Sequence, residues 1–284
     1  MTVQLPEPAA EVPAGGFSHS ADAVDFERRF GGLARLYGRQ GAQQIAQARV
    51  AVVGIGGVGS WAAEALARSG VAQLVLVDLD NVAESNINRQ IHATSLTLGQ
   101  PKVQAMRERI ALIHPSCRVH EVEDFVDEGN VGQILGACSL TAVIDACDQV
   151  RAKAAMAHWC RQQRLPFISV GAAGGRKSAH QMEIADLGAV THDPLLAQLR
   201  YRLRKHYGAE KRPHKPLGVP CIFSREAVVR AHQADAVDGG SQACEVQADH
   251  SLNCAGYGSS VAVTASFGMA AAGWIMQQLA RKRG

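Results

Sequence analysis

Residues 49–59, RVAVVGIGGVG, constrain the fold more than any other part of the chain. They begin as an apolar, β-branched run and end in glycines with the spacing G-x-G-x-x-G, at Gly54, Gly56 and Gly59. A helical pattern, SWAAEALARSG, follows at once, so the predicted order is strand, glycine turn and helix. Glycine is needed here because a side chain would block the turn and keep a phosphate away from the backbone N–H groups. We therefore predict a nucleotide-phosphate site, the alternative being a purely structural turn.

The composition is that of an ordinary globular protein. With 284 residues the chain can form one large or two modest domains, and 47% hydrophobic residues can build a sizeable core. The net charge of +3 is too small to indicate a partner. The N-terminus lacks the basic and apolar regions of a signal peptide, so we expect a cytoplasmic protein.

The cysteines are odd in number and irregular in spacing, and no two form a C-x-x-C pair. The seven are Cys117, Cys138, Cys147, Cys160, Cys221, Cys244 and Cys254. We expect reduced thiols, most of them buried, and no zinc site. Cys221, in LGVPCIFSREAV, is the candidate for a reactive thiol, but no histidine or lysine stands beside it. A buried bystander is therefore the favoured interpretation of Cys221.

Acidic residues mark the end of the second predicted strand, residues 73–77. Asp78 follows Gly59 by 19 positions, and Asp80 comes two residues later. A carboxylate at this point of a dinucleotide-type fold is placed to accept hydrogen bonds from a ribose. The alternative is a strand-end carboxylate in solvent.

A long polar loop, NVAESNINRQIHATSLTLGQPK, follows these acids. Loops of this length and polarity are more often functional than idle. Arg89 has the forked guanidinium that suits phosphate oxygens, and Lys102, which opens a predicted helix, supplies a point charge for a triphosphate. Asn86 and Asn88 suit capping and ligand binding equally, and the sequence does not decide between the two roles.

Strands and helices alternate through the first half of the chain. Further strands are predicted at about residues 118–122, 142–144 and 166–170, with helices near 130–135 and 149–163. This alternation predicts an α/β fold, a Rossmann-like, doubly wound and mainly parallel sheet with helices on both faces.

The fourth predicted strand runs into the sequence DACD, which holds Asp145 and Asp148. Folds of this class bind ligands just past the carboxyl ends of their strands. Asp148 is therefore a candidate partner for Mg²⁺ bound with a triphosphate. Its alternative role is the N-cap of the helix that follows.

A basic, aromatic segment at residues 200–215 follows the glycine-rich turn GAAGG. It holds seven Lys or Arg residues and a single acid, with Tyr201 and Tyr207 interleaved. Phosphate contacts combined with stacking are what RNA binding demands, so we predict a substrate-binding surface. The candidates are Arg200, Arg202, Arg204, Lys205, Lys211 and Arg212. The alternative is a solvated helix face.

The two ends of the chain differ. Residues 1–24 lack periodicity and predict a disordered tail, and residues 225–255 predict a flexible loop. Residues 260–280 are long enough to span a bilayer, but their Ala, Gly and polar content favours a helix packed on the core. A membrane contact of this helix is the alternative.

Four motifs in order, GIGGVGS, DLDNVAESNINRQ, GQPK and DACD, resemble the adenylating domain of the ubiquitin-activating enzyme superfamily, which includes the bacterial activators of sulfur-carrier proteins. RFGGLARLYG, DPLLAQLRYRLR and LGVPCIFSREA look like its tRNA threonylcarbamoyladenosine dehydratase branch. The resemblance implies an N-terminal helix with an ATP-binding adenylating domain at residues 25–175. It also implies a tRNA-binding region at 176–258 and a C-terminal helix at 259–284.

The resemblance further implies a homodimer that binds ATP and Mg²⁺, adenylates a carboxylate and lets an internal nucleophile displace AMP. In this branch the carboxylate is the threonyl group of the modified adenosine beside the tRNA anticodon, and the product is the cyclic form of that base. By position it puts Gly57 at the phosphates, Asp78 on the ribose, Arg89 and Lys102 on the triphosphate and Asp148 at the metal. An N-terminal arginine reaches the partner's nucleotide in relatives, and both Arg29 and Arg35 remain candidates.

The paired C-x-x-C zinc motifs of many relatives are missing, so zinc is not expected. A sulfur-relay partner, such as a cysteine desulfurase or sulfur acceptor, is left open by the resemblance. Three other functions stay open: activation of a sulfur-carrier or ubiquitin-like protein, NAD-dependent oxidation, and non-catalytic nucleotide and tRNA binding. The missing zinc motif and the basic segment count against the first, and Arg89 and Lys102 have no role in the second.

Overall fold

The computed structural model describes residues 25–212, 215–228 and 258–281. The predicted disordered tail and most of the predicted flexible loop lie outside these residues. So do Cys244 and Cys254.

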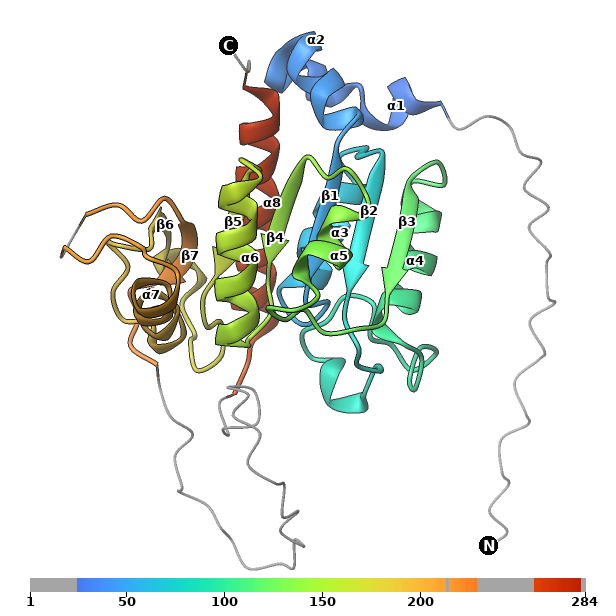
Figure 1. Ribbon diagram of the computed structural model, residues 1–284. Coiled ribbons are helices and arrows are strands. Elements are labelled where there is room, and N and C mark those ends of the chain that lie inside the picture. Colours follow the sequence, from blue (N-terminus) through green and yellow to red (C-terminus); the bar gives the residue numbers. More distant parts are fainter. Residues whose placement is uncertain (1–24, 213–214, 229–257, 282–284) are drawn as a thin grey trace, which may run out of the picture.

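The strands form one seven-stranded sheet in the order β3-β2-β1-β4-β5-β7-β6 (Figure 1). Their bounds are β1 Arg49–Val53, β2 Gln73–Val77, β3 Arg118–Val122, β4 Ala142–Asp145, β5 Phe167–Val170, β6 Met182–Asp186 and β7 Pro220–Ser224. All neighbouring pairs are parallel except β6 and β7. The predicted doubly wound, mainly parallel sheet is confirmed, and the segment after residue 176 continues it through β6 and β7.

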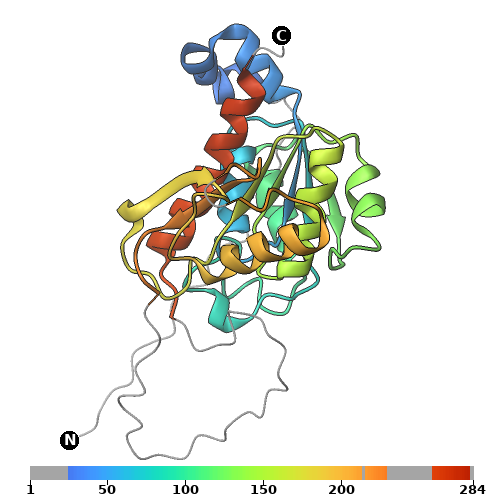
Figure 2. The ribbon, with the colours of Figure 1, turned by 60° about the vertical axis from the view of Figure 1, so that its left-hand side comes forward.

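Helices cover both faces of the sheet (Figure 1). One face carries α3 Gly59–Ala67, α4 Lys102–Ile113 and α8 Val261–Ala280, and the other carries α5 Val131–Gly136, α6 Val150–Gln162 and α7 Pro194–His206. Two short 3₁₀ turns, η1 Glu84–Asn86 and η2 Ala179–Gln181, lie in the connections. Helices α1 Phe26–Phe30 and α2 Gly32–Ala46 precede β1, and α2 meets the C-terminal end of α8 (Figure 2).

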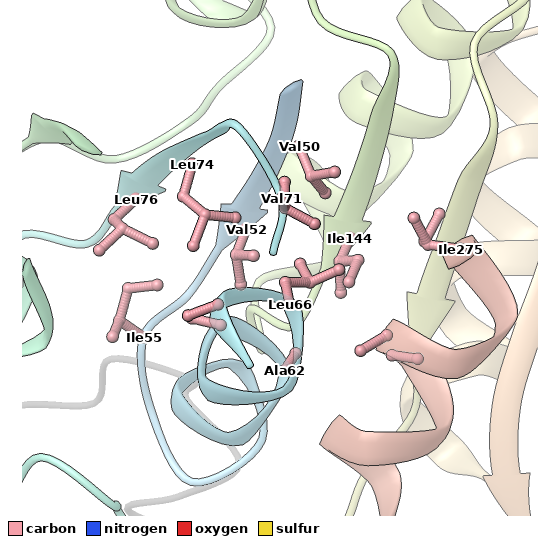
Figure 3. Packing of buried hydrophobic residues seen from close by; sticks show 14 of the residues in the cluster. Val50, Val52, Ile55, Ala62, Leu66, Val71, Leu74, Leu76, Ile144 and Ile275 are labelled. Carbon is pink, nitrogen blue, oxygen red and sulfur yellow. The ribbon is translucent and has the colours of Figure 1, made fainter. Parts of the chain in front are cut away.

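The alternation of side chains along β1 divides the core into two layers. Val50 and Val52 belong to the cluster under α3 and α8, whereas Ala51 and Val53 belong to the cluster under α5, α6 and α7. Figure 3 shows side chains of β1, β2 and β4 meeting those of α3, with Ile275 of α8 beside them. An apolar run buried on both faces is what a central parallel strand requires.

The C-terminal helix α8 is a core helix, as its composition predicts. Val263, Phe267, Ala271 and Ile275 are fully buried against the sheet and α3. Within the residues that the structure describes, no helix combines the length and the apolarity needed to cross a bilayer.

Close packing of α8 on α3 depends on Gly268. A Cβ atom at this position would overlap the carbonyl oxygen of Val58 and lie 2.9 Å from the backbone nitrogen of Ala62. We expect Gly268→Ala to lower the free energy of unfolding by about 1–3 kcal/mol, because the helices must move apart. Gly273→Ala, in the same helix with nothing within 4 Å, should instead raise it by about 0.5–1 kcal/mol. Urea unfolding of both variants tests this, and equal effects would contradict it.

Candidate active site

One pocket at the carboxyl edge of the sheet gathers most of the residues predicted to bind ATP. It is lined by Gly54, Gly56, Gly57, Asp78, Asp80, Arg89, Lys102 and Asp148. It continues to the turn after β5 and to the start of α7, with Gly171, Ala172, Ala173, Gly174, Pro194 and Leu195. Ser259 and Thr264 contribute from the start of α8. Such an edge is where doubly wound folds hold their ligands.

The glycine turn after β1 is required by close backbone contacts. Gly54 has a φ of 87°, and a Cβ there would lie 2.8 Å from the backbone nitrogen of Cys147. At Gly59 a Cβ would overlap the carbonyl oxygen of Gly54. Gly56 and Gly57 line the pocket, whereas Gly59 does not, so Gly59 serves the packing of α3 on the turn.

Asp78 ties the glycine turn to the end of β2. Its carboxylate accepts hydrogen bonds from the backbone N–H groups of Ile55, at 2.6 Å, and Asp80, at 2.9 Å. Burial raises the pKa of Asp78, and the ammonium of Lys102, 3.8 Å away, works in the opposite direction. Each carboxylate oxygen has a second lone pair, so the group can still accept from a ribose.

The two predicted phosphate cations are held in defined places. Lys102 is 6% exposed, and its Nζ lies 2.6 Å from the carboxylate of Asp80. Arg89 lies against Gly57 and donates to the carbonyl of Ser85, at 2.8 Å, and to the side chain of Asn88, at 3.0 Å. Both side chains thus line one pocket together with the glycine turn.

The structure separates Asn86 from the ligand-lining residues. Its Oδ1 accepts the backbone N–H of Ala83 at 3.1 Å, and Asn86 does not line the pocket. The side chain thus makes the contact that the capping alternative expects, and binding of ATP by Asn86 stays a prediction. Sequence could not decide between the roles because Asn serves turns and ligands equally well.

Asp148 lines the pocket, but Asp145, its neighbour in the DACD turn, is committed elsewhere. Asp145 is fully buried and accepts from Lys153 Nζ, at 3.1 Å, and from Ser169 Oγ, at 2.6 Å. The N-cap of α6 is Gln149, so the N-cap alternative for Asp148 is wrong. Among the described residues there is no group of three His, Cys, Asp or Glu that could hold a metal by itself.

Two cysteines lie near this network. Cys147 lines the pocket, and its Sγ donates to Asp145 at 3.1 Å. Cys221 is fully buried in β7, in agreement with the bystander interpretation. Burial raises the pKa of both thiols, which keeps them in the protonated, unreactive form.

Neither N-terminal arginine contacts this pocket. Arg29, in α1, donates to the carbonyl of Ile113, and Arg35 is exposed on α2. Both helices lie at the end of the sheet opposite to the pocket (Figure 1).

Most of the basic segment in and after α7 is engaged within the chain. Arg200 donates to the carbonyls of Leu187 and Val190, and Arg204 to those of Glu210 and Arg212. Arg202 pairs with Glu128, and Arg212 pairs with Glu210. Lys205 and Lys211 are exposed and form no ion pair with any described residue. The Nζ of Lys205 lies over the ring of Tyr201, 5.6 Å from its centroid, and both lysines are exposed enough for a ligand to reach them.

Three buried charged residues around the pocket were not predicted from the sequence. Lys153 is fully buried, Arg176 is 2% exposed and Asp193 is 4% exposed. Asp193 caps α7 by accepting from the backbone N–H of Leu196 at 2.9 Å. The D-P start of α7 was the available sign for this cap, because Asp at the N-cap followed by Pro is a helix-start signal.

The comparison with known families agrees with this geometry. Residues 30–281 match the model of the ThiF family. The chain belongs to the ThiF family. This match spans the glycine turn, the polar loop, the DACD turn, α7 and α8.

Similar proteins narrow the position of the chain within the family. It is 44% identical to the tRNA threonylcarbamoyladenosine dehydratase of Escherichia coli (strain K12), over 90% of this chain and 95% of that one. It is 37% identical to the protein of the same name in Haemophilus influenzae, over 94% of this chain and 99% of that protein. Crystal structures of the E. coli enzyme, TcdA, have been determined in complex with ATP and with AMP. Compared with this chain, each has a TM-score of 0.78 and a sequence identity of 42%, and the match covers 89% of this chain and 94% of the E. coli chain.

Proposed function

We propose that this chain is an ATP-dependent dehydratase of N6-threonylcarbamoyladenosine in tRNA. The observation that carries the proposal is one pocket in which the glycine turn, Asp78, Arg89, Lys102 and Asp148 meet. It occurs in a chain 44% identical to the E. coli dehydratase over 90% of its length. A relative of the same fold in complex with ATP and with AMP supports a reaction that consumes ATP and releases AMP.

The proposed reaction has two steps. First, an oxygen of the threonyl carboxylate attacks the α-phosphorus of ATP, and pyrophosphate leaves. Second, the carbamoyl group of the same nucleoside loses a proton and attacks the acyl carbon, and AMP leaves with the former carboxylate oxygen. Activation is needed because the leaving group of an unmodified carboxylate would be oxide. Ring closure needs only a held geometry, since both reacting groups belong to one nucleoside.

The residues of the pocket have matching roles in this proposal. Arg89 and Lys102 stabilise the negative charge that builds up on the α-phosphate and pyrophosphate. Asp78 accepts from the ribose, and Gly56 and Gly57 let the phosphates approach the backbone. A magnesium ion bound with ATP supplies further charge neutralisation. The residues fit it, because Mg²⁺ is usually held by one or two carboxylates plus substrate phosphates and waters, and Asp148 is in the pocket.

The test of the function is conversion of the nucleoside. ATP turnover to AMP and pyrophosphate is measured with tRNA that carries threonylcarbamoyladenosine and with unmodified tRNA, followed by mass analysis of the nucleosides. Loss of one water from the modified base, in step with AMP release, is the expected result. AMP release without a change of the base would overturn the proposal and favour activation of a carrier protein.

The exposed lysines of α7 and the segment after it are proposed to contact tRNA phosphates. We expect the double variant Lys205→Gln/Lys211→Gln to weaken tRNA binding and to reduce the slope of log K against log salt by about 1.5, since each phosphate contact contributes about 0.7–0.9. Arg118→Gln, on the opposite edge strand β3, is the matched control. Affinity measured by filter binding at several salt concentrations tests this. An unchanged slope would contradict the proposed phosphate contacts and indicate that the segment is a solvated helix face.

We further propose that the protein acts as a cytoplasmic homodimer. Helices α1 and α2, which carry Arg29 and Arg35, lie at the end of the sheet opposite to the pocket, so these arginines are proposed to reach a nucleotide in another copy (Figure 1). Light scattering on the purified protein tests the dimer. A sulfur-relay partner stays a prediction, and the burial of α8 against the sheet favours the core-helix interpretation over a membrane contact.

A further inference from the structure

The pocket has two unlike halves. One half carries charged side chains from the loops after β2 and β4, the side chains proposed to bind ATP and its metal: Asp78, Arg89, Lys102 and Asp148. The other half is lined by the turn after β5 and the start of α7, where the residues are small or apolar: Gly171, Ala172, Ala173, Gly174, Pro194 and Leu195. In the strand order β5 lies beyond β4, away from β1 and β2. A triphosphate needs the charged half, whereas the lining of the β5 half suits the flat base of a nucleoside.

One buried carboxylate joins the two segments of this β5 half. Asp193 Oδ1 accepts the backbone N–H of Leu196, in the first turn of α7, at 2.9 Å. Its Oδ2 accepts the backbone N–H of Ala172, in the turn after β5, also at 2.9 Å. Asp193 is 4% exposed and does not line the pocket. A single side chain behind the pocket wall therefore sets the spacing between the two segments that line it.

The turn after β5 is shaped to receive this carboxylate. A Cβ atom at Gly171 would overlap Asp193 Oδ2 and would lie 2.8 Å from Leu196 Cδ1. A residue with a side chain at this position would push the turn and α7 apart, because interiors are close-packed. Glycine at position 171 is therefore what lets the carboxylate and α7 approach the turn.

Arg176 holds the same turn from its carbonyl side. This residue is 2% exposed, and its Nε donates to Ala172 O at 2.7 Å. One of its terminal nitrogens lies 3.4 Å from Asp193 Oδ2. The guanidinium also donates to the carbonyls of His192, at 3.0 Å, and Ser224, at 2.8 Å. The N–H and the carbonyl of Ala172 are thus bound by buried groups of opposite charge, which fixes the turn in one position.

We propose that Asp193 is a positioning residue for the second substrate, because it fixes the spacing between the β5 turn and α7, and that the modified nucleoside binds between these two segments. The inference rests on the proposed function and names the half of the pocket that receives the nucleoside. Attack of the threonyl carboxylate on the α-phosphorus requires the two reacting groups to be held in line. A misplacement of about 1 Å lowers the rate of such a reaction about 100-fold. ATP is held by the charged half, so its affinity does not depend on Asp193.

Asp193→Asn tests the inference. The amide oxygen can replace only one of the two carboxylate oxygens, and the amide NH₂ then faces the other N–H group, so one segment is released. We expect kcat/KM for modified tRNA, measured as AMP release, to fall about 100-fold while the Kd for ATP stays at the wild-type value. Glu64→Gln is the matched control, because Glu64 is also a buried carboxylate paired with arginine, and it does not line the pocket. Both kcat/KM and the Kd for ATP should stay near the wild-type values in Glu64→Gln.

Wild-type kcat/KM in Asp193→Asn would overturn the inference, and so would a loss of ATP affinity in the same proportion or an equal fall of kcat/KM in Glu64→Gln. If Asp193→Asn does not fold, Gly171→Ala decides, because its methyl group displaces Asp193 Oδ2 without removing a charge. A lower kcat/KM at constant Kd for ATP in Gly171→Ala supports the inference, and wild-type values overturn it. Dehydration of the base by the wild type is measured first and tests the proposed function alone, so the two failures are distinguishable.

Discussion

Replacing Asp148 by asparagine is expected to lower AMP formation by about 1000-fold while the protein stays folded. Asp148 lines the pocket beside the glycine turn, whereas its neighbour Asp145 is neutralised by Lys153. We therefore propose that Asp148, and not Asp145, is the carboxylate of the DACD turn that shares a magnesium ion with the triphosphate. Losing several kcal/mol of charge stabilisation in the transition state corresponds to about three powers of ten in rate.

The measurement is pyrophosphate release at saturating ATP over a range of Mg²⁺ concentrations. Asparagine keeps the shape of the side chain, so circular dichroism and thermal unfolding should match the wild type. Glu123→Gln is the control, because Glu123 is an exposed acid near the pocket edge that does not line it. Turnover at the wild-type rate in Asp148→Asn would exclude the metal role of this residue.

Replacing Lys153 by methionine is expected to lower the free energy of unfolding by about 3–5 kcal/mol. The variant leaves the carboxylate of Asp145 buried without its cation, and removal of one partner from a buried ion pair typically costs that much. It also removes the hydrogen bond to Val170 O. Burial works to lower the pKa of Lys153, but Asp145 and the neighbouring groups outweigh it, so the pKa lies above the ordinary value for lysine. Lys153 is therefore protonated at neutral pH.

A double-mutant cycle separates the pair from general packing. Lys153→Met/Asp145→Asn removes both charges, and we expect it to be more stable than Lys153→Met alone. Lys215→Met, at an exposed position, should change the free energy of unfolding by less than about 0.5 kcal/mol. Urea unfolding of the wild type, the single variants and the double variant gives the values. If the double variant is as unstable as the sum of both single variants, Lys153 and Asp145 are not coupled, and the ion pair does not explain the loss of stability.

The two experiments address different consequences of one arrangement. Lys153 holds the carboxyl end of β4, from which the Asp148 turn begins, to the end of β5, from which the turn at residues 171–175 begins. A buried cation thus connects the turns that follow β4 and β5, and both turns line the same pocket. Because interiors are packed and fully hydrogen-bonded, a change at this lysine is expected to reach both turns.

Much of the fold could be read from local sequence. The strand at residues 49–53, the glycine turn after it and the strand at residues 73–77 occur where the pattern predicts them, because apolar alternation and glycine spacing act over a few neighbouring residues. The same holds for Asp78, Arg89, Lys102 and Asp148, which follow strand ends that a parallel sheet brings to one edge. The family resemblance rested on these same short motifs.

Only the tertiary structure decided what the remaining polar side chains do. A run of basic residues says nothing about which carbonyl each arginine reaches, and Arg200 and Arg204 proved to hold loops through carbonyls brought near by folding. Lys153 meets Asp145 and Val170 O because α6 packs across β4 and β5. Local patterns determine where strands and turns form, whereas the partner of a buried polar group depends on elements far apart in the chain.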